Sequence, residues 1–306
     1  METTYIPAFT LTPAKKAETP RPSAARTGHK TPRFIDDVAA GRVELPTIPG
    51  VVQRLIVALR DPQVDSRAIV EVLSSDPVLS AKVLKVANSS FFGGQRSMSS
   101  IDAAVALIGV QALNRLIMAC GVAATFEAVP GIDMHLFWRD ALVAATAANK
   151  LAPRLGADPE LAYLCGLMHS TGHLILCRSY PEIADAMFTG FAPARGAELT
   201  AIETEAFGID HPTAGALWIE SLGFPQAVAE TIRKTAWPLE KVHEPLDVAV
   251  CSGCALGAAI ARGDDADAAL AVLPPSLQAG FRAPNGKADA AFSRLHELLL
   301  ETQPPL

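Results

Sequence analysis

The sequence has few charged and few aromatic residues, and it has no apolar run long enough to span a membrane. Charged residues make up 19% and aromatic residues 6% of the 306 residues, whereas half of the chain is apolar. A membrane-spanning helix needs about 20 apolar residues. The longest candidate, residues 248–261, is shorter and is bounded by Asp247 and Arg262. The first residues have neither the basic nor the apolar part of a secretory signal. We therefore expect a globular chain with a sizeable core and no membrane span.

Cysteine is also scarce, and its pattern excludes a disulfide scaffold. The five cysteines are scattered: Cys120, Cys165, Cys177, Cys251 and Cys254. Only Cys251 and Cys254 have the spacing of a redox or zinc half-motif. They are expected in the middle of a helix, and no second pair is evident to complete a zinc site. We interpret them as core residues, and we predict a reducing, cytoplasmic setting for the chain.

Basic residues are outnumbered by acidic ones, 26 to 32, and the net charge of −6 argues against nucleic-acid binding. The charge is unevenly placed, because residues 1–34 hold six basic and only two acidic groups. Residues 1–40 are rich in Pro, Thr and Ala and show no periodicity, which is typical of a disordered basic tail. A docking arm for an acidic partner or a membrane surface is the alternative interpretation.

Beyond this tail almost every segment has the helical period, and no run alternates as a strand would. Asp-Pro pairs at residues 76–77 and 158–159 combine an N-cap with a proline at the first helical position. The sequence therefore predicts an all-α fold. The expected helices cover residues 51–59, 65–73, 77–89, 101–108, 110–126, 133–155, 181–187, 197–207, 210–222, 225–235, 244–262 and 288–302, and a further helix begins at Pro159 and leads into the segment around His169.

Five stretches, taken in order, resemble the motifs of one family, the HDOD domain (HD-related output domain) of bacterial signalling proteins. They are Leu-Pro-Thr-Ile-Pro at 45–49, Asp-Pro-Val-Leu at 76–79 with Val-Leu-Lys-Val-Ala-Asn-Ser at 83–89, the 101–109 helix ending in Leu-Ile-Gly, Gly-Leu-Met-His at 166–169, and Phe-Gly-Ile-Asp-His-Pro at 207–212. The resemblance covers residues 45 to about 255. It implies an all-helical, HD-like fold used as a regulatory or interaction module.

The resemblance also sets the expected boundaries. The HDOD domain is placed at residues 41–262, with an N-terminal helical part at 41–129 packed on an HD-like part at 131–262. Residues 263–306 are expected to form a linker and a C-terminal helix.

Catalytic members of the wider HD superfamily bind a divalent metal through several His and Asp ligands, and the resemblance allows each position to be compared. In this sequence the positions are Asp140, His169, Ser170 and Cys254. Ser170 stands where the aspartate of the His-Asp pair is expected, and residues 248–262 contain no carboxylate before Arg262. Because a serine and a cysteine replace two carboxylates, the site is predicted to be degenerate, with no metal and no cofactor. His173, one turn after His169, is a candidate for an additional ligand.

We therefore predict a non-catalytic signalling module, a pseudoenzyme that acts by contact with a regulatory protein partner and not on nucleic acid. Two alternatives remain open at this point. One is a metal-dependent phosphohydrolase or cyclic-dinucleotide phosphodiesterase. The other is a sensor that binds a nucleotide second messenger without cleaving it. The sequence does not specify the partner, the pathway or the oligomeric state.

Overall fold

The computed structural model describes residues 33–50, 52–54, 73, 76–88, 100–126, 128–188, 196–302 and 304. Within these residues the regular elements are helical, and the β-type pairing is limited to one isolated bridge between Arg282 and Ala288. The predicted all-α fold is confirmed. The helices predicted at residues 51–59 and 65–73 lie largely outside the described residues. The described helices are α1 (Phe34–Ala39), α4 (Pro77–Ala87), α5 (Ile101–Ile108), α6 (Val110–Ala123), α7 (Met134–Leu155), α8 (Pro159–Met168), α9 (Thr171–Ser179), α10 (Pro181–Phe188), α11 (Ala197–Phe207), α12 (His211–Ser221), α13 (Gln226–Arg233), the 3₁₀ helices η3 (Lys234–Ala236) and η4 (Leu239–Lys241), α14 (Pro245–Arg262), α15 (Ala266–Ala271), α16 (Pro275–Ala279) and α17 (Ala290–Glu301).

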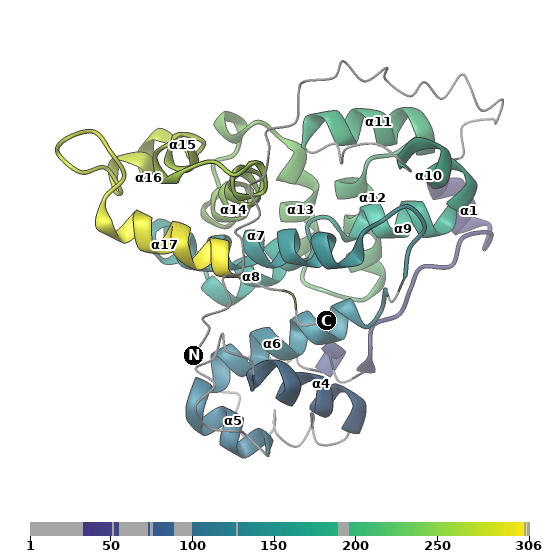
Figure 1. The fold of residues 1–306 in the computed structure, drawn as a ribbon. Helices are drawn as coiled ribbons and strands as arrows, with labels where there is room; N and C mark the ends of the chain where they lie inside the picture. The colour runs from purple at the N-terminus through teal and green to yellow at the C-terminus, as the bar shows by residue number, and fades with distance from the viewer. Residues whose placement is uncertain are drawn as a thin grey trace, which may run out of the picture.

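Helices α4, α5 and α6 lie together at the bottom of the molecule in Figure 1. The predicted caps start two of them. Asp76 accepts a hydrogen bond from the backbone N–H of Leu79 (3.0 Å), and Ser100 accepts one from that of Ala103 (3.2 Å). Gly109, with φ at 80°, ends α5 and allows the chain to turn into α6. The hydrophobic core of this group continues without a break into the helices from α7 to α14.

The long helices α7 and α14 pack along each other at the centre of the molecule, and α8 packs on both. Small residues bring the backbones together. A Cβ atom on Gly253 of α14 would lie 2.5 Å from the carbonyl oxygen of Ala144 and 2.9 Å from the backbone nitrogen of Ala148, both in α7. The close approach therefore requires glycine at this position.

Among the described helices, α14 is the one that is long and apolar enough to cross a membrane by length and composition. It is 56% buried inside the protein, and it lies between α7, α8 and η3. Its apolar composition is thus the one that a central core helix needs.

Helices α9 to α13 pack on one side of the central helices, and α15 to α17 pack on the other, at the left of Figure 1. The second group buries its own cluster, with Phe281, Phe292 and Leu299 against Leu151 of α7 and Leu256 of α14. The expectation of a linker at 263–288 is wrong in part, because α15 and α16 lie in that stretch and Leu270 and Leu277 are buried.

The N-terminal segment is more ordered than the sequence suggested. The predicted disordered tail at residues 1–40 is wrong for its last part, because α1 begins at Phe34, whose side chain is 1% exposed. Asp37 accepts a hydrogen bond from the hydroxyl of Tyr180 (2.6 Å), and the carbonyl of Pro46 accepts one from the indole N–H of Trp218 (2.6 Å). Residues 33–48 therefore cross the HD-like part before the chain enters α4 to α6 (Figure 1).

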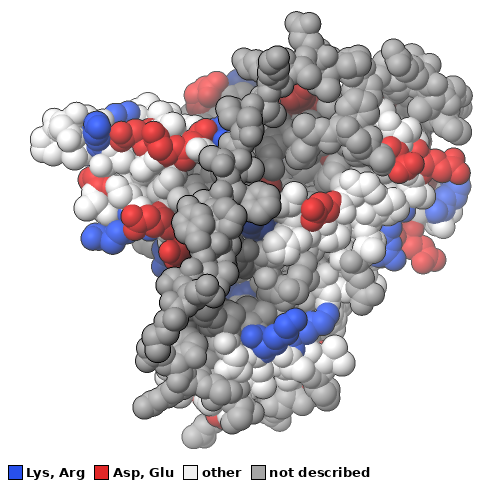
Figure 2. All heavy atoms as spheres, in the orientation of Figure 1, with Lys and Arg blue, Asp and Glu red and all other residues white. Residues whose placement is uncertain are grey.

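The coloured residues in Figure 2 carry both signs of charge. Acidic and basic side chains alternate over the end of the molecule formed by α15 to α17 and again at the opposite end, near α1 and α10. The coloured residues of this face form no extended field of a single sign.

Candidate functional site

His169 occupies the short connection between α8 and α9, and its ring has one fixed partner. Its Nδ1 atom lies 2.7 Å from the carbonyl oxygen of Gly166. A carbonyl can only accept, so Nδ1 carries the proton and donates, and Nε2 keeps its lone pair. Burial lowers the pKa of His169 to about 4, against the effects of the Gly166 carbonyl and of the nearby Asp140 carboxylate. The ring is therefore neutral at physiological pH.

The other three predicted site positions, Asp140, Ser170 and Cys254, supply few groups that could bind a metal. Asp140, on α7, affects the charge of His169 and also lies 3.3 Å from the guanidinium of its neighbour Arg139. Ser170 precedes α9, but its side chain does not cap that helix. Cys254, on α14, is partly exposed, and burial of its thiol raises its pKa well above the usual value, so it stays protonated.

These donors do not fit a divalent metal. The set offers one neutral imidazole, one carboxylate, one hydroxyl and one protonated thiol, whereas hydrolytic sites of this type use several anionic or imidazole ligands on one ion. Among the described residues, no group of three or more His, Cys, Asp and Glu side chains is arranged to hold a metal ion.

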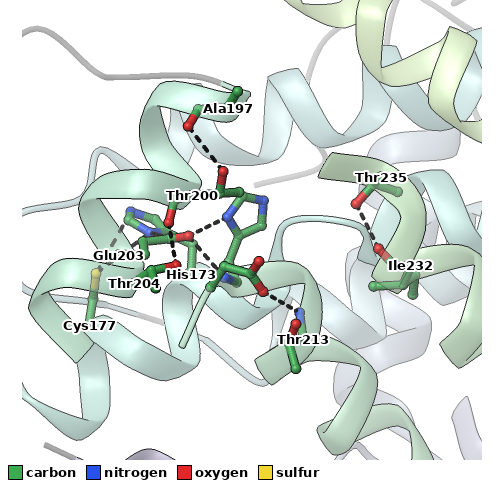
Figure 3. A network of polar contacts seen from close by, with 11 residues as sticks. His173, Cys177, Ala197, Thr200, Glu203, Thr204, Thr213, Ile232 and Thr235 are labelled. Carbon is green, nitrogen blue, oxygen red and sulfur yellow. Dashed lines mark hydrogen bonds and ion pairs between the residues drawn. The ribbon is translucent and has the colours of Figure 1, made fainter. Parts of the chain in front are cut away.

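The sequence-based prediction did not anticipate a buried polar network that lies beside this site (Figure 3). Glu203, on α11, is fully buried and holds two imidazoles. Its Oε1 atom lies 2.6 Å from Nδ1 of His173 on α9, and its Oε2 atom lies 2.6 Å from Nδ1 of His211 on α12. The backbone N–H of His211 also donates to Oε2, over 2.9 Å. We call His173, Glu203 and His211 the histidine–glutamate triad.

The carboxylate and the imidazoles of this triad stabilise each other's charged forms. Burial alone would raise the pKa of Glu203, but His211 and His173 outweigh it and lower the value to about 2. Burial also disfavours the imidazolium form of His173. Cys177, whose sulfur lies 3.7 Å from its Nε2 atom, and the Glu203 carboxylate outweigh burial and raise its pKa to about 10. The triad therefore holds an ion pair in the core at neutral pH.

The triad changes the interpretation of one residue. His173 was a candidate metal ligand near His169, but its Nδ1 atom is bonded to Glu203 on another helix. His211 is buried at the start of α12, and the cap of that helix is Asp210, which accepts from the N–H of Thr213 (3.0 Å). One sequence signal pointed to Glu203: it falls on the same helical face as Ala206 and Phe207, which are buried.

The interpretation of Cys251 and Cys254 as mid-helix residues is confirmed, because both lie inside α14. Burial raises the pKa of Cys251 to about 12, so neither thiol is activated.

A second buried ionic contact lies at the start of α14. Asp247 accepts hydrogen bonds from the Thr231 hydroxyl (2.5 Å) and from the Lys234 ammonium group.

Comparison with known proteins places these features in a family. The family model of the HDOD domain matches residues 45–238. An uncharacterized protein of Treponema pallidum (strain Nichols) is 26% identical over 206 residues, which are 67% of this chain and 40% of that protein. The chain thus spans less than half the length of this curated relative.

Two crystal structures have similar folds. One, from Shewanella amazonensis SB2B, is described provisionally as a phosphohydrolase. It is 27% identical with a TM-score of 0.66, and the match covers 88% of this chain and 96% of that one. The other, from Marinobacter aquaeolei VT8, is described provisionally as a signal transduction protein. It is 24% identical with a TM-score of 0.62, and the match covers 90% of this chain and 62% of that one.

Proposed function

The chain belongs to the HDOD domain family, and on that basis we propose that it is a non-catalytic signalling module that acts by contact with a regulatory protein. The observation that carries the proposal is the donor set around His169. The fold of a hydrolytic domain is retained, whereas Ser170 and Cys254 stand where carboxylate ligands are expected. A neutral hydroxyl and a protonated thiol are poor ligands for the hard divalent metals that such hydrolysis uses.

The cytoplasmic location is part of the same proposal. All five cysteines are free thiols, and four of them are buried, so that the structure gains nothing from an oxidising compartment. The alternation of charge in Figure 2 gives no extended basic field of the kind that nucleic-acid binding uses, within the coloured residues of that face.

The main alternative is metal-dependent phosphohydrolysis, which the provisional description of the Shewanella protein favours. The test is metal analysis of the purified full chain, together with a panel of phosphomonoesters, phosphodiesters and cyclic dinucleotides. We expect no stoichiometric Mn, Fe or Ni and no turnover. Stoichiometric metal with turnover that is lost in His169→Ala would overturn the proposal.

Calorimetry with cyclic dinucleotides distinguishes a second-messenger sensor from the module that we propose. We expect no heat of binding at high micromolar ligand. Saturable binding that weakens in His169→Ala, in the absence of turnover, would instead indicate a sensor and would contradict action through protein contact alone.

A further inference from the structure

The turn between α16 and α17, at the left end of the molecule in Figure 1, presents an asparagine–glycine pair to solvent. The sequence has four asparagines, Asn88, Asn114, Asn149 and Asn285, and only the last is followed by glycine. Residues 284–287 are exposed, and Gly286 has φ at 80°. Because glycine has no Cβ atom, its backbone nitrogen is open to close approach. The pair therefore places a side-chain amide next to an unshielded backbone nitrogen.

Hydrogen bonds hold the Asn285 side chain in this turn. Its Oδ1 atom accepts from the backbone N–H of Lys287 over 3.1 Å. A donor at Oδ1 stabilises the negative charge that develops on this oxygen when the side-chain carbon, Cγ, is attacked. The N–H of Gly286 donates to the carbonyl of Ala283 over 2.9 Å. A hydrogen bond in an exposed turn opens by local fluctuation at little cost in free energy, and the nitrogen is then available.

We propose that Asn285 is a site of spontaneous covalent modification, at which the folded protein converts this asparagine into isoaspartate and aspartate. The nitrogen of Gly286 attacks Cγ of Asn285 and the bond from Cγ to Nδ2 breaks. The side-chain nitrogen leaves as ammonia and takes up the proton that the Gly286 nitrogen gives away. Water opens the resulting succinimide ring. Opening at the main-chain carbonyl gives isoaspartate, and opening at Cγ gives aspartate, without oxidation or reduction.

Two other asparagines lie in helices and are held away from this reaction. Asn149 of α7 is 8% exposed, and its Nδ2 atom donates to the carbonyl of Pro159 over 2.9 Å. Asn114 lies inside α6, where the next backbone nitrogen, that of Arg115, belongs to the helical hydrogen-bond ladder. The helix keeps this nitrogen away from the side-chain carbon. Asn114 and Asn149 are therefore internal controls for Asn285.

The modification changes charge and backbone at one place on the surface. A carboxylate replaces a neutral amide that is flanked in the sequence by Arg282 and Lys287. Isoaspartate also extends the main chain by a methylene group, inside the loop that the N–H of Ala283 closes on the carbonyl of Lys287 (2.9 Å). The base of the turn stays closed, because Asp289 donates to the carbonyl of the buried Phe281 over 2.7 Å. The change is thus confined to the tip of the turn.

The experiment is incubation of the folded full chain in mildly alkaline H₂¹⁸O, followed by digestion with pepsin in acid and mass spectrometry of the peptides. The peptide with Asn285 should gain about 3 Da, because the amide nitrogen is lost and a labelled oxygen is taken up. Conversion during digestion in ordinary water would add only about 1 Da. The peptides with Asn114 and Asn149 should keep their masses. A carboxyl methyltransferase that accepts isoaspartyl residues should label the product.

Gly286→Asn is the matched variant, because asparagine tolerates a positive φ whereas its Cβ atom shields the nitrogen. We expect it to slow the labelling of residue 285 about tenfold or more. Asn285→Gln should abolish the labelling, since a six-membered ring closes far more slowly. If Gly286→Asn fails to fold, the comparison of Asn285 with Asn149 in the wild type decides.

No labelling of Asn285 in the folded wild type, or labelling no faster than that of Asn149, would overturn the proposal. Equal rates in the wild type and a folded Gly286→Asn would also overturn it, because the unshielded nitrogen would then play no part. Aspartate without isoaspartate would indicate direct hydrolysis of the amide and would exclude the succinimide.

Discussion

His169 and His173 lie one helical turn apart, and their surroundings give them opposite charge states. His169 is half-buried and has a backbone carbonyl as its hydrogen-bond partner, and desolvation of its ring lowers its pKa to about 4. His173 faces a buried carboxylate and a sulfur atom, and its pKa is raised to about 10. At neutral pH, histidine is thus neutral at the degenerate site and protonated in the triad.

The stability contributed by His173 should disappear in alkali. Its pKa in the folded protein lies above the unfolded value of about 6.5, so the stabilisation is complete below about pH 6.5 and is lost as pH rises toward 10. We expect the wild-type melting temperature to fall between about pH 7 and pH 10. His173→Gln should cost about 1–3 kcal/mol at neutral pH and should flatten this fall.

Thermal melts over this pH range measure both effects. His243→Gln, at an exposed position, is the control and should melt as the wild type does at every pH. An unchanged alkaline slope in His173→Gln would show that another group carries the proton.

The degenerate site can be tested by restoring a carboxylate. In Ser170→Asp, the new oxygen ligand next to His169 should restore weak Mn²⁺ affinity, because a hard divalent metal prefers carboxylates. The affinity should stay below that of a complete site, since Cys254 supplies no further carboxylate beyond Asp140 and the one introduced at position 170. The variant should also be slightly less stable without metal, because a partly buried carboxylate is costly.

Calorimetric titration with Mn²⁺ measures the restored affinity. Ser170→Asn is the matched control, because asparagine has the size of aspartate but no charge. If wild type and Ser170→Asp bind Mn²⁺ equally tightly, Ser170 is not the missing ligand position.

At the scale of helices, the contact between α9 and α12 depends on glycine. Gly172→Ala would place a Cβ atom 2.0 Å from the His211 carbonyl and 2.5 Å from the Gly215 nitrogen, both backbone atoms that cannot give way without moving a helix. We expect a loss of about 3 kcal/mol or more in the free energy of unfolding.

Chemical denaturation measures this loss, and Gly257→Ala in α14 is the matched control. There the new Cβ atom would lie 3.5 Å from the Ala144 Cβ, an ordinary contact, so the variant should be neutral or up to about 1 kcal/mol more stable. Similar stabilities for the two variants would contradict the close packing of α9 on α12.

The helices were predictable where local chemistry determines them. Asp158 followed by a proline correctly located the start of α8, and the helix expected from residue 133 begins at Met134, with Asp133 as its cap. The short helices α1, α15 and α16 were not predicted, because five or six residues give too little periodicity and their stability comes from packing. The helical face that Glu203 shares with Ala206 and Phe207 indicates burial but not pairing. Its two imidazole partners lie 30 and 8 residues away on other helices, and a local pattern does not reveal such partners.

At the scale of the molecule, the N-terminal segment should contribute to stability. A chain that starts at residue 45 loses the buried Phe34 and the hydrogen bond between Asp37 and Tyr180. Relative to a chain that starts at residue 33, we expect it to be less stable by about 2–4 kcal/mol, which lowers the melting temperature by roughly 5–15 °C. Calorimetry on the two chains measures the difference, and equal melting temperatures would mean that α1 does not pack on the core.

The path of this segment also has a consequence for synthesis on the ribosome. The hydrogen bond between Pro46 and Trp218 can form only after 172 further residues have been synthesised, and the one between Asp37 and Tyr180 only after 143. At about 5–20 residues per second, synthesis of the residues between Pro46 and Trp218 takes roughly 10–35 s. During that time the nascent N-terminal segment, with Phe34 uncovered, is available to chaperones or to neighbouring chains. The last contacts of the N-terminal helix are therefore closed by the second half of the protein, and they form late in the life of the nascent chain.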